Sequence, residues 1–150
     1  VPIIYPTTVR SSLGVLFTPF FWNRVVHQSL DEFRFAFVNR LAPADQKSAY
    51  DRYVIPETGR IFYQALTAPF HNITRIDFNN ATRGPFLMVA GGADQNVTAA
   101  MNRVNFSRYK NSKAVTEFKE FEGRCHWIIA QDGWEEVGGS MEHWFGRVTK

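Results

Sequence analysis

The feature that most constrains the fold is an alternation of strand-length and helix-length segments near the C-terminus. The run Phe86–Ala90 is continuously apolar, has the length of a strand and is ended by two glycines. A second strand is predicted at Ala114–Phe121, which is enriched in strand-forming residues. Between them, Val97, Met101 and Val104 recur at helical spacing. This order indicates parallel strands joined by a crossover helix.

A final helix is predicted after the second strand. Asp132 and Glu135 match a capping box at its start. Gly138 and Gly139 in its interior cost about 1 kcal/mol each relative to alanine. The apolar stripe that defines this helix consists of Trp134, Val137, Met141, Trp144, Phe145 and Val148. The predicted fold class is therefore α/β, with parallel strands and flanking helices.

A helical block without strands is predicted for residues 15–80. Ser29 and Glu32 match a capping box, and apolar residues then recur every three or four positions over about three turns. Pro43 and Pro56 each suit the first turn of a further helix, because proline is tolerated there.

Residues 1–14 are predicted to form a strand and an irregular connector. VPIIYP is a β-branched run closed by proline, and Gly14 and Pro19 argue against regular structure before the first helix. The expected units are residues 1–14, 15–80 and 81–150. A chain that begins at Val1 is expected to be part of a longer protein or to have lost an upstream segment.

Composition excludes several classes of protein. The 150 residues suffice for one domain with a sizeable core. The net charge of +3 comes from scattered Lys and Arg, which does not support a nucleic-acid or anionic-membrane partner. The apolar stretches fall well short of the roughly 20 residues of a membrane span. The single cysteine is compatible with a reducing cytosol, so a cytoplasmic location is expected.

Two predicted loops carry polar side chains at the carboxyl ends of the strands. Asp94 lies in GGADQNV, and His126 lies in EGRCHW. Adjacent parallel strands bring such loops to one edge of the sheet, so we expect the two residues to meet. An aspartate that binds one imidazole nitrogen fixes the tautomer and leaves the other nitrogen to act as a general base.

Cys125 precedes His126, which raises the alternative of a thiol nucleophile. A reactive cysteine needs surroundings that favour the thiolate, and adjacent side chains tend to point in different directions. We therefore favour Asp94 as the partner of His126 and expect Cys125 to fill space, with Gly123 easing the turn. A purely structural role for the histidine is the other alternative.

The stretch GPFLMVAGGADQNV…AVTEFKEFEGRCHWII…GWEEV resembles the C-terminal part of α/β-hydrolase-fold enzymes. The resemblance implies that Asp94 is the catalytic acid and His126 the catalytic histidine. It also implies that residues 15–80 are a cap over the active site, which VPIIYP enters as a strand. The family's nucleophile motif, G-x-S-x-G, has no match, since SSLG and GGSM differ in pattern. A complementary N-terminal segment, separate or missing, would carry the nucleophile.

The expected function is hydrolysis of a small, largely apolar substrate without a cofactor. A serine nucleophile implies ester or related acyl hydrolysis, whereas an aspartate implies epoxide or halide chemistry, and both remain open. The four histidines are dispersed and form no zinc motif. Candidate substrate-binding residues are Trp127, Phe20, Phe21 and Trp22. The alternatives are a non-catalytic binding protein and an inactive fragment of the fold with unpaired sheet edges.

Overall fold

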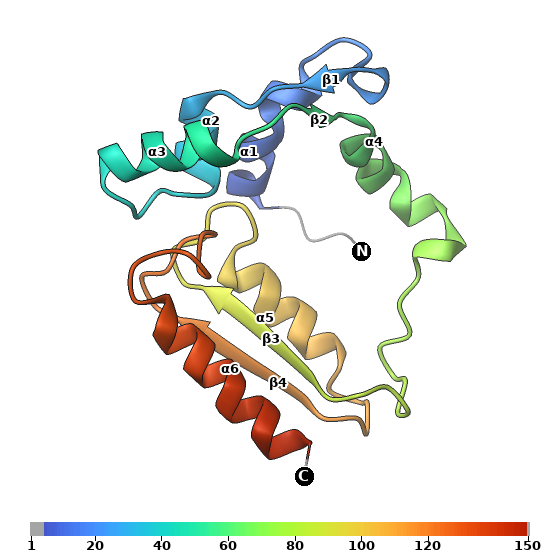
Figure 1. Ribbon diagram of the computed structural model, residues 1–150. Helices are drawn as coiled ribbons and strands as arrows, with labels where there is room; N and C mark the ends of the chain where they lie inside the picture. The colour runs from blue at the N-terminus through green and yellow to red at the C-terminus, as the bar shows by residue number, and fades with distance from the viewer. Residues whose placement is uncertain (1–4, 150) are drawn as a thin grey trace.

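The computed structural model describes residues 5–149, which form a mixed α/β structure in two regions (Figure 1). The helical region spans residues 6–74 and the α/β region spans residues 84–149. The helices are α1 (Pro6–Leu16), α2 (Leu30–Ala36), α3 (Pro43–Tyr53), α4 (Arg60–Thr67), α5 (Ala99–Arg108) and α6 (Trp134–Val148). The strands are β1 (Val25–Val26), β2 (Glu57–Thr58), β3 (Phe86–Gly91) and β4 (Thr116–Phe121). Short 3-10 turns lie at Phe21–Asn23, Ala68–Phe70 and Asn72–Thr74.

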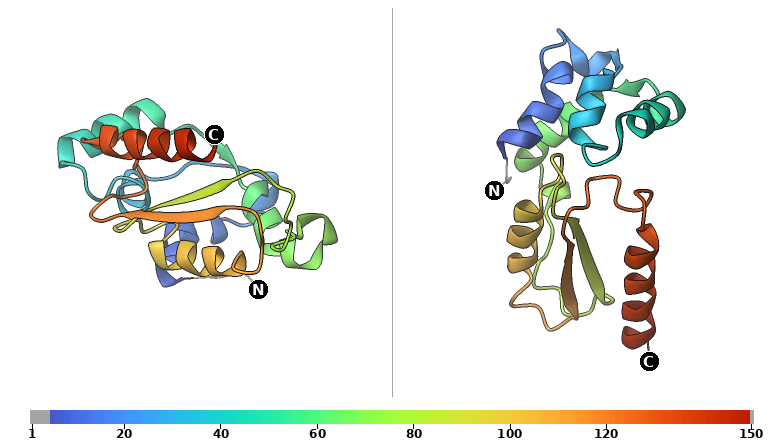
Figure 2. Two further views of the ribbon diagram at one scale, coloured as in Figure 1. Left: turned by 90° about the horizontal axis from the view of Figure 1, so that it is seen from below. Right: turned by 90° about the vertical axis from the view of Figure 1, so that its left-hand side faces the viewer.

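The α/β region confirms the predicted strand–helix–strand–helix order. β3 and β4 are parallel, with Phe86 opposite Thr116 and Gly91 opposite Phe121. Helices α5 and α6 cover opposite faces of this pair (Figure 2). The carboxyl end of β3 is buried. Both strands point with their carboxyl ends toward the helical region, so the loops that follow them lie next to that region (Figure 1).

Helix α6 begins one residue later than a capping box at Asp132 would require, so that prediction is wrong. Its N-cap is Gly133, whose φ of 76° is left-handed. Arg124 donates to the carbonyls of Asp132 (2.7 Å) and Gly133 (2.6 Å), and its guanidinium also lies 3.2 Å from a carboxylate oxygen of Glu136. These bonds from the preceding loop fix where the helix starts.

Helix α2 confirms the predicted capping box but ends early. The hydroxyl of Ser29 accepts from the amide of Glu32 (3.3 Å), and the Glu32 carboxylate accepts from the amide of Ser29 (2.8 Å). The helix stops at Ala36 because the carbonyl of Phe37 accepts a bond from the amide of Trp127 (3.1 Å), in the α/β region. A tertiary contact therefore replaces the third helical turn.

The predicted irregular connector before the first helix is wrong, since most of it is helix α1. The strand predicted at VPIIYP falls mainly on residues 1–4, outside the described residues, and Pro6 already occupies the first turn of α1. Gly14 does not break the helix. An added Cβ there would meet only the carboxylate end of the flexible Glu32 side chain, which would have to move. Helices α1 and α2 pack against each other at this point.

The helical region also contains the short antiparallel pair β1–β2, which the prediction of a block without strands missed. Val25 pairs with Thr58, and Val26 pairs with Glu57. Because Glu57 and Thr58 are extended, α4 starts at Arg60 rather than at Pro56. By contrast, α3 starts at the predicted Pro43.

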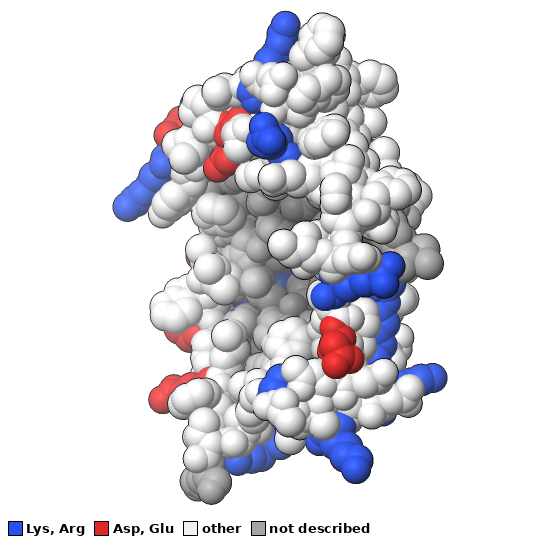
Figure 3. Space-filling model, turned by 90° about the vertical axis from the view of Figure 1, so that its right-hand side faces the viewer, with Lys and Arg blue, Asp and Glu red and all other residues white. Residues whose placement is uncertain are grey.

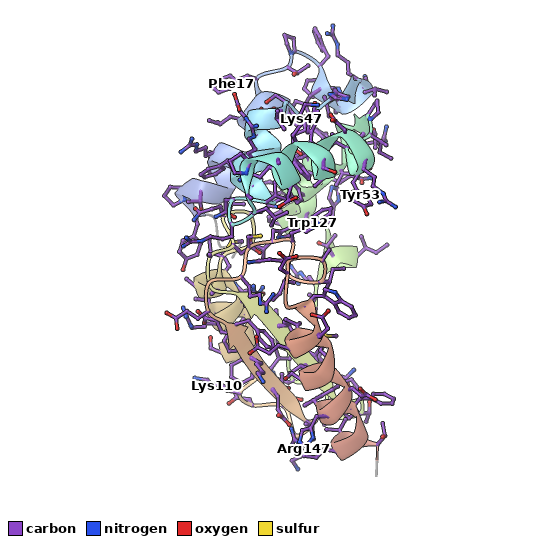
Figure 4. All side chains as sticks on the ribbon, turned by 60° about the vertical axis from the view of Figure 1, so that its left-hand side comes forward. Phe17, Lys47, Tyr53, Lys110, Trp127 and Arg147 are labelled. Carbon is purple, nitrogen blue, oxygen red and sulfur yellow. The ribbon has the colours of Figure 1, made fainter. Side chains whose placement is uncertain are left out.

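A core cluster in the helical region extends to the junction with the α/β region. Phe33, Val38 and Ala49 are buried, and Trp127 of the α/β region packs against them. The Trp127 ring lies 5.4 Å from that of Tyr53, between their centroids. Figure 4 shows Trp127 just below Tyr53, at the boundary of the two regions. The loop that carries His126 is thereby fixed to the helical region.

Candidate active site

The loop after β3 holds Asp94 in one orientation. Asp94 is 8% exposed. Its Oδ1 accepts bonds from the backbone amides of Asn96 (2.8 Å) and Val97 (2.9 Å). Its second oxygen, Oδ2, lies 2.8 Å from Nδ1 of His126. Because an ionised carboxylate only accepts, the imidazole hydrogen in this bond lies on Nδ1.

The loop after β4 presents His126 through a tight turn. Gly123 adopts a φ of 74°, which confirms the predicted need for glycine there. The His126 side chain is 31% exposed, and its Nε2 has no hydrogen-bond partner among residues 5–149. The predicted meeting of Asp94 and His126 is confirmed. The pair has the geometry of an oriented imidazole with one nitrogen available for proton transfer.

The two loops approach so closely that only glycine fits at the end of β3. A Cβ on Gly91 would lie 2.5 Å from the carbonyl oxygen of Arg124 and 2.8 Å from that of Cys125. The amide of Ala93 also donates to the Arg124 carbonyl (2.8 Å). The backbones of the two loops are thus in direct contact, and this contact sets the distance between Asp94 and His126.

Cys125 is fully buried, and its partner is Gln131. The backbone amide of Cys125 donates to Oε1 of Gln131 (3.0 Å), and the thiol lies 3.4 Å from the same oxygen. The imidazole beside it is engaged with Asp94 instead. This arrangement agrees with the expectation that Cys125 fills space, because the thiol is bonded to a neutral amide rather than to a base.

A cavity of about 610 Å³ lies mainly in the helical region and reaches the α/β region at Asn96 and Trp127. Its wall is mainly apolar and includes Val15, Val26, Phe33, Phe37, Val54 and Trp127. The predicted contact Trp127 therefore lines the cavity. The His126 ring lies behind this wall, because the ring of Phe37 contacts it edge to face with 4.9 Å between centroids.

The structure does not bring the other three predicted substrate-binding residues to this cavity. Phe20 and Trp22 are exposed and Phe21 is buried. The ring of Trp22 packs edge-on against both phenylalanines. Trp22 further contacts Tyr63 of α4. These aromatic residues form a cluster on the outer side of the helical region rather than a ligand-binding wall.

Sequence reasoning missed the groups that tie the helical region to the site. The side chain of Asn39 donates to the carbonyl of Ala93 (3.0 Å), next to Asp94. Ser11 of α1 donates to the side-chain oxygen of Asn96 (3.0 Å), and Thr8 donates to the Asn96 carbonyl (2.8 Å). These contacts join residues 54 or more positions apart, and no local pattern marks them, so only the folded structure reveals them.

Among residues 5–149, no three His, Cys, Asp or Glu side chains are placed to bind a metal ion. The same residues contain no helix with the length and apolar character needed to cross a bilayer. Comparison with protein-family models, curated proteins and solved structures finds no match to this chain. The candidate site therefore depends on its own geometry, chiefly the bond between Asp94 and His126.

Proposed function

We propose that this chain is the acid–histidine half of an α/β-hydrolase-type enzyme that hydrolyses a small, largely apolar substrate. The observation that carries the proposal is the 2.8 Å bond between Asp94 Oδ2 and His126 Nδ1, formed by two loops at the carboxyl ends of parallel strands. Residues of the helical region would act as the cap. The cavity that Phe37 and Trp127 line, with His126 behind the ring of Phe37, has the size and apolar wall of a small-molecule site.

In the proposed mechanism with a serine nucleophile, Nε2 of His126 removes the hydroxyl proton as the serine oxygen attacks the substrate. Asp94 holds the imidazole in the correct tautomer and stabilises the imidazolium. His126 then gives the proton to the leaving group. A water molecule, deprotonated by the same nitrogen, hydrolyses the covalent intermediate. The serine route passes through an acyl-enzyme, and His126 returns the proton of the water to the serine oxygen as the product acid leaves. An aspartate would form an alkyl-enzyme, and because a carboxylate has no proton to give, His126 would act there only on the hydrolytic water.

The nucleophile would come from a complementary N-terminal polypeptide segment. No serine, threonine or cysteine side chain among residues 5–149 is hydrogen-bonded to His126. In the same residues β3 and β4 pair only with each other, so each has an unpaired edge. Figure 3 shows a hollowed face in which charged side chains lie mainly around the rim. Such a face suits a partner that extends the sheet, since parallel sheets are normally buried by further strands and helices.

The test is to combine the chain with the complementary segment and to measure hydrolysis of p-nitrophenyl esters. In this reconstituted enzyme we expect His126→Ala and Asp94→Asn each to lower kcat about 10³- to 10⁴-fold. The matched control is His143→Ala, which alters an exposed histidine on α6 and should leave kcat unchanged. Full activity of His126→Ala would exclude the mechanism.

A chain that binds apolar ligands but, with the segment present, hydrolyses no ester, epoxide or haloalkane would support the non-catalytic alternative.

A further inference from the structure

The segment Phe37–Asn39 joins α2 to both loops of the candidate site, and we call it the bridging segment. It leaves α2 at its C-terminal end and runs into the boundary between the two regions. Its first residue contacts the histidine loop and its last residue contacts the aspartate loop. Among the described residues of the helical region, no other stretch of three residues bonds to both loops.

Phe37 holds the histidine loop through two groups. Its carbonyl accepts from the amide of Trp127 (3.1 Å), directly after His126. Its ring lies edge to face with the His126 ring at 81°, and stacks on Phe33 with 5.4 Å between centroids. The imidazole is therefore fixed by Asp94 on one side and by an anchored phenyl ring on another. Rotation of the imidazole away from Asp94 requires Phe37 to move.

Asn39 holds the aspartate loop. Its side-chain amide donates to the carbonyl of Ala93 (3.0 Å), one residue before Asp94. The Oδ1 atom of Asn39 is buried and has no hydrogen-bond partner in the described structure. An unpaired buried oxygen is costly, and the bond that the same amide donates to Ala93 offsets part of that cost.

Val38, between them, anchors the segment in the helical region. It is completely buried in the cluster with Phe33 and Ala49. Its carbonyl accepts from the side chain of Gln46 on α3 (3.1 Å). The two flanking contacts to the site are thus made from a rigid base rather than from a free loop.

From these contacts we propose that Phe37 and Asn39 are positioning residues that set the orientation of the Asp94–His126 pair from the helical region. This inference rests on the proposed function of that pair. Because Phe37 also lines the cavity, a ligand that displaces its ring also disturbs the imidazole. Binding in the cavity and orientation of His126 are therefore coupled through one side chain.

The primary test reads the imidazole tautomer rather than activity. Side-chain ¹⁵N chemical shifts of His126 are measured at alkaline pH, where a histidine ring is neutral. In the unaltered chain we expect the Nδ1–H tautomer to dominate, because the carboxylate of Asp94 accepts that hydrogen. Asp94→Asn should abolish this preference. Asn39→Ala and Phe37→Leu should each give a mixture of the two tautomers.

Two controls separate positioning from general stability. Asn79→Ala removes an exposed amide from the linker and should change neither the tautomer nor the melting temperature. Phe21→Leu alters a buried residue of the outer aromatic cluster, away from the bridging segment, and should lower the melting temperature while the Nδ1–H tautomer persists. In the reconstituted enzyme, Asn39→Ala should lower kcat about 10- to 100-fold with little change in KM. Phe37→Leu should change both constants, because it also lines the cavity.

The outcomes distinguish this inference from the proposed function. If Asp94→Asn abolishes the Nδ1–H preference while Asn39→Ala and Phe37→Leu keep it, the positioning role is wrong and the Asp94–His126 pair stands. If the unaltered chain shows no Nδ1–H preference, the pair itself is not formed and both proposals fail. If Phe21→Leu shifts the tautomer as far as Asn39→Ala, the effect is general loss of structure, which overturns the specific role of Asn39.

Discussion

The α/β region and the helical region meet at the candidate site, but they are stabilised by different interactions. In the α/β region, the ends of β3 and β4 are joined by backbone contacts, such as the amide of Ala93 on the carbonyl of Arg124 at 2.8 Å. In the helical region, rings pack on rings around Phe33 and Tyr50. Backbone contacts set distances to a fraction of an ångström, whereas aromatic packing tolerates exchange of side chains of similar volume.

This difference predicts where the molecule is sensitive to small changes. A single methyl group should be disruptive at the loops of the α/β region, and whole side chains should be replaceable in the outer part of the helical region. Trp127 and the bridging segment contact both regions, so we expect them to be intermediate in their sensitivity to substitution. The following variants compare the two regions directly.

The largest effect on stability is expected from a methyl group at the end of β3. Gly91→Ala would place a Cβ 2.5 Å from the carbonyl oxygen of Arg124, so backbone must move. We expect a loss of about 1–3 kcal/mol in the free energy of unfolding, together with a weaker Asp94–His126 bond. Thermal or urea unfolding measures the first effect, and the tautomer of His126 reports the second.

The matched control is Gly139→Ala in the interior of α6, where an added Cβ meets no atom within 4 Å. Alanine has the higher helix propensity, so this variant should gain about 0.5–1 kcal/mol. Equal stability of the two alanine variants would mean that the loops are not packed as closely as the structure has them.

A smaller effect is expected where the histidine loop forms the cavity wall. Trp127→Leu removes ring surface that lines the cavity and contacts Tyr53, and we expect KM for an apolar ester to rise about tenfold, or ~1.4 kcal/mol. Trp22→Leu alters the outer aromatic cluster and should leave KM within about twofold, or ~0.4 kcal/mol. Steady-state kinetics of the reconstituted enzyme measure both. A rise in KM for Trp22→Leu as large as that for Trp127→Leu would mean that the outer aromatic cluster contributes to substrate binding.

Some parts of this structure could be predicted from the sequence and others could not. The run Phe86–Ala90 predicted a buried strand because apolar continuity is a local property, and the meeting of Asp94 and His126 followed from the geometry of parallel strands. Phe20 and Trp22 were assigned to the substrate site because aromatic composition does not tell which way a ring points. Local pattern therefore predicted elements and loop positions, but not the direction of side chains.

The remaining errors have a similar cause. The two-residue strand Val25–Val26 exists only through its partner, so it has no pattern of its own. The sequence predicts irregular structure at Gly14, whereas this residue lies inside α1, beside the carboxylate of Glu32. The contact of Asn39 with Ala93 joins residues 54 positions apart, and no periodicity records it. Each error concerns an interaction between segments that are distant in the sequence.

Within the histidine loop, Cys125→Ser tests whether the thiol has a chemical role. The serine hydroxyl can keep the bond to Gln131, so we expect a loss of about 1 kcal/mol in stability and activity within a few-fold of the unaltered chain. Melting temperature and kcat/KM are the measurements. A loss of about a thousandfold in activity, which corresponds to ~4 kcal/mol of transition-state stabilisation, would make Cys125 a nucleophile and displace the proposed mechanism.

The smallest effect is expected at the end of the α/β region farthest from the loops, where Arg147 of α6 donates to Glu117 of β4 (2.6 Å). Figure 4 shows Arg147 at the lower end of α6. The pKa of Glu117 is lowered, mainly by this hydrogen bond and further by the positive charge of Arg147, while desolvation opposes the shift. A lowered folded-state pKa stabilises the protein above the unfolded-state pKa, and this stabilisation is lost as pH falls through the folded value.

Glu117→Gln should therefore lower the melting temperature slightly at neutral pH, and the difference from the unaltered chain should vanish in acid. Added salt should reduce the same difference, because the pair is accessible to solvent. Glu142→Gln, an exposed α6 residue, serves as the control and should show no such pH dependence. Since this ion pair lies away from the site, the variant should leave kcat unchanged. A loss of activity in Glu117→Gln would show that the far end of the sheet also bears on the Asp94–His126 pair, so that the sensitivity of the α/β region would not be confined to its loops.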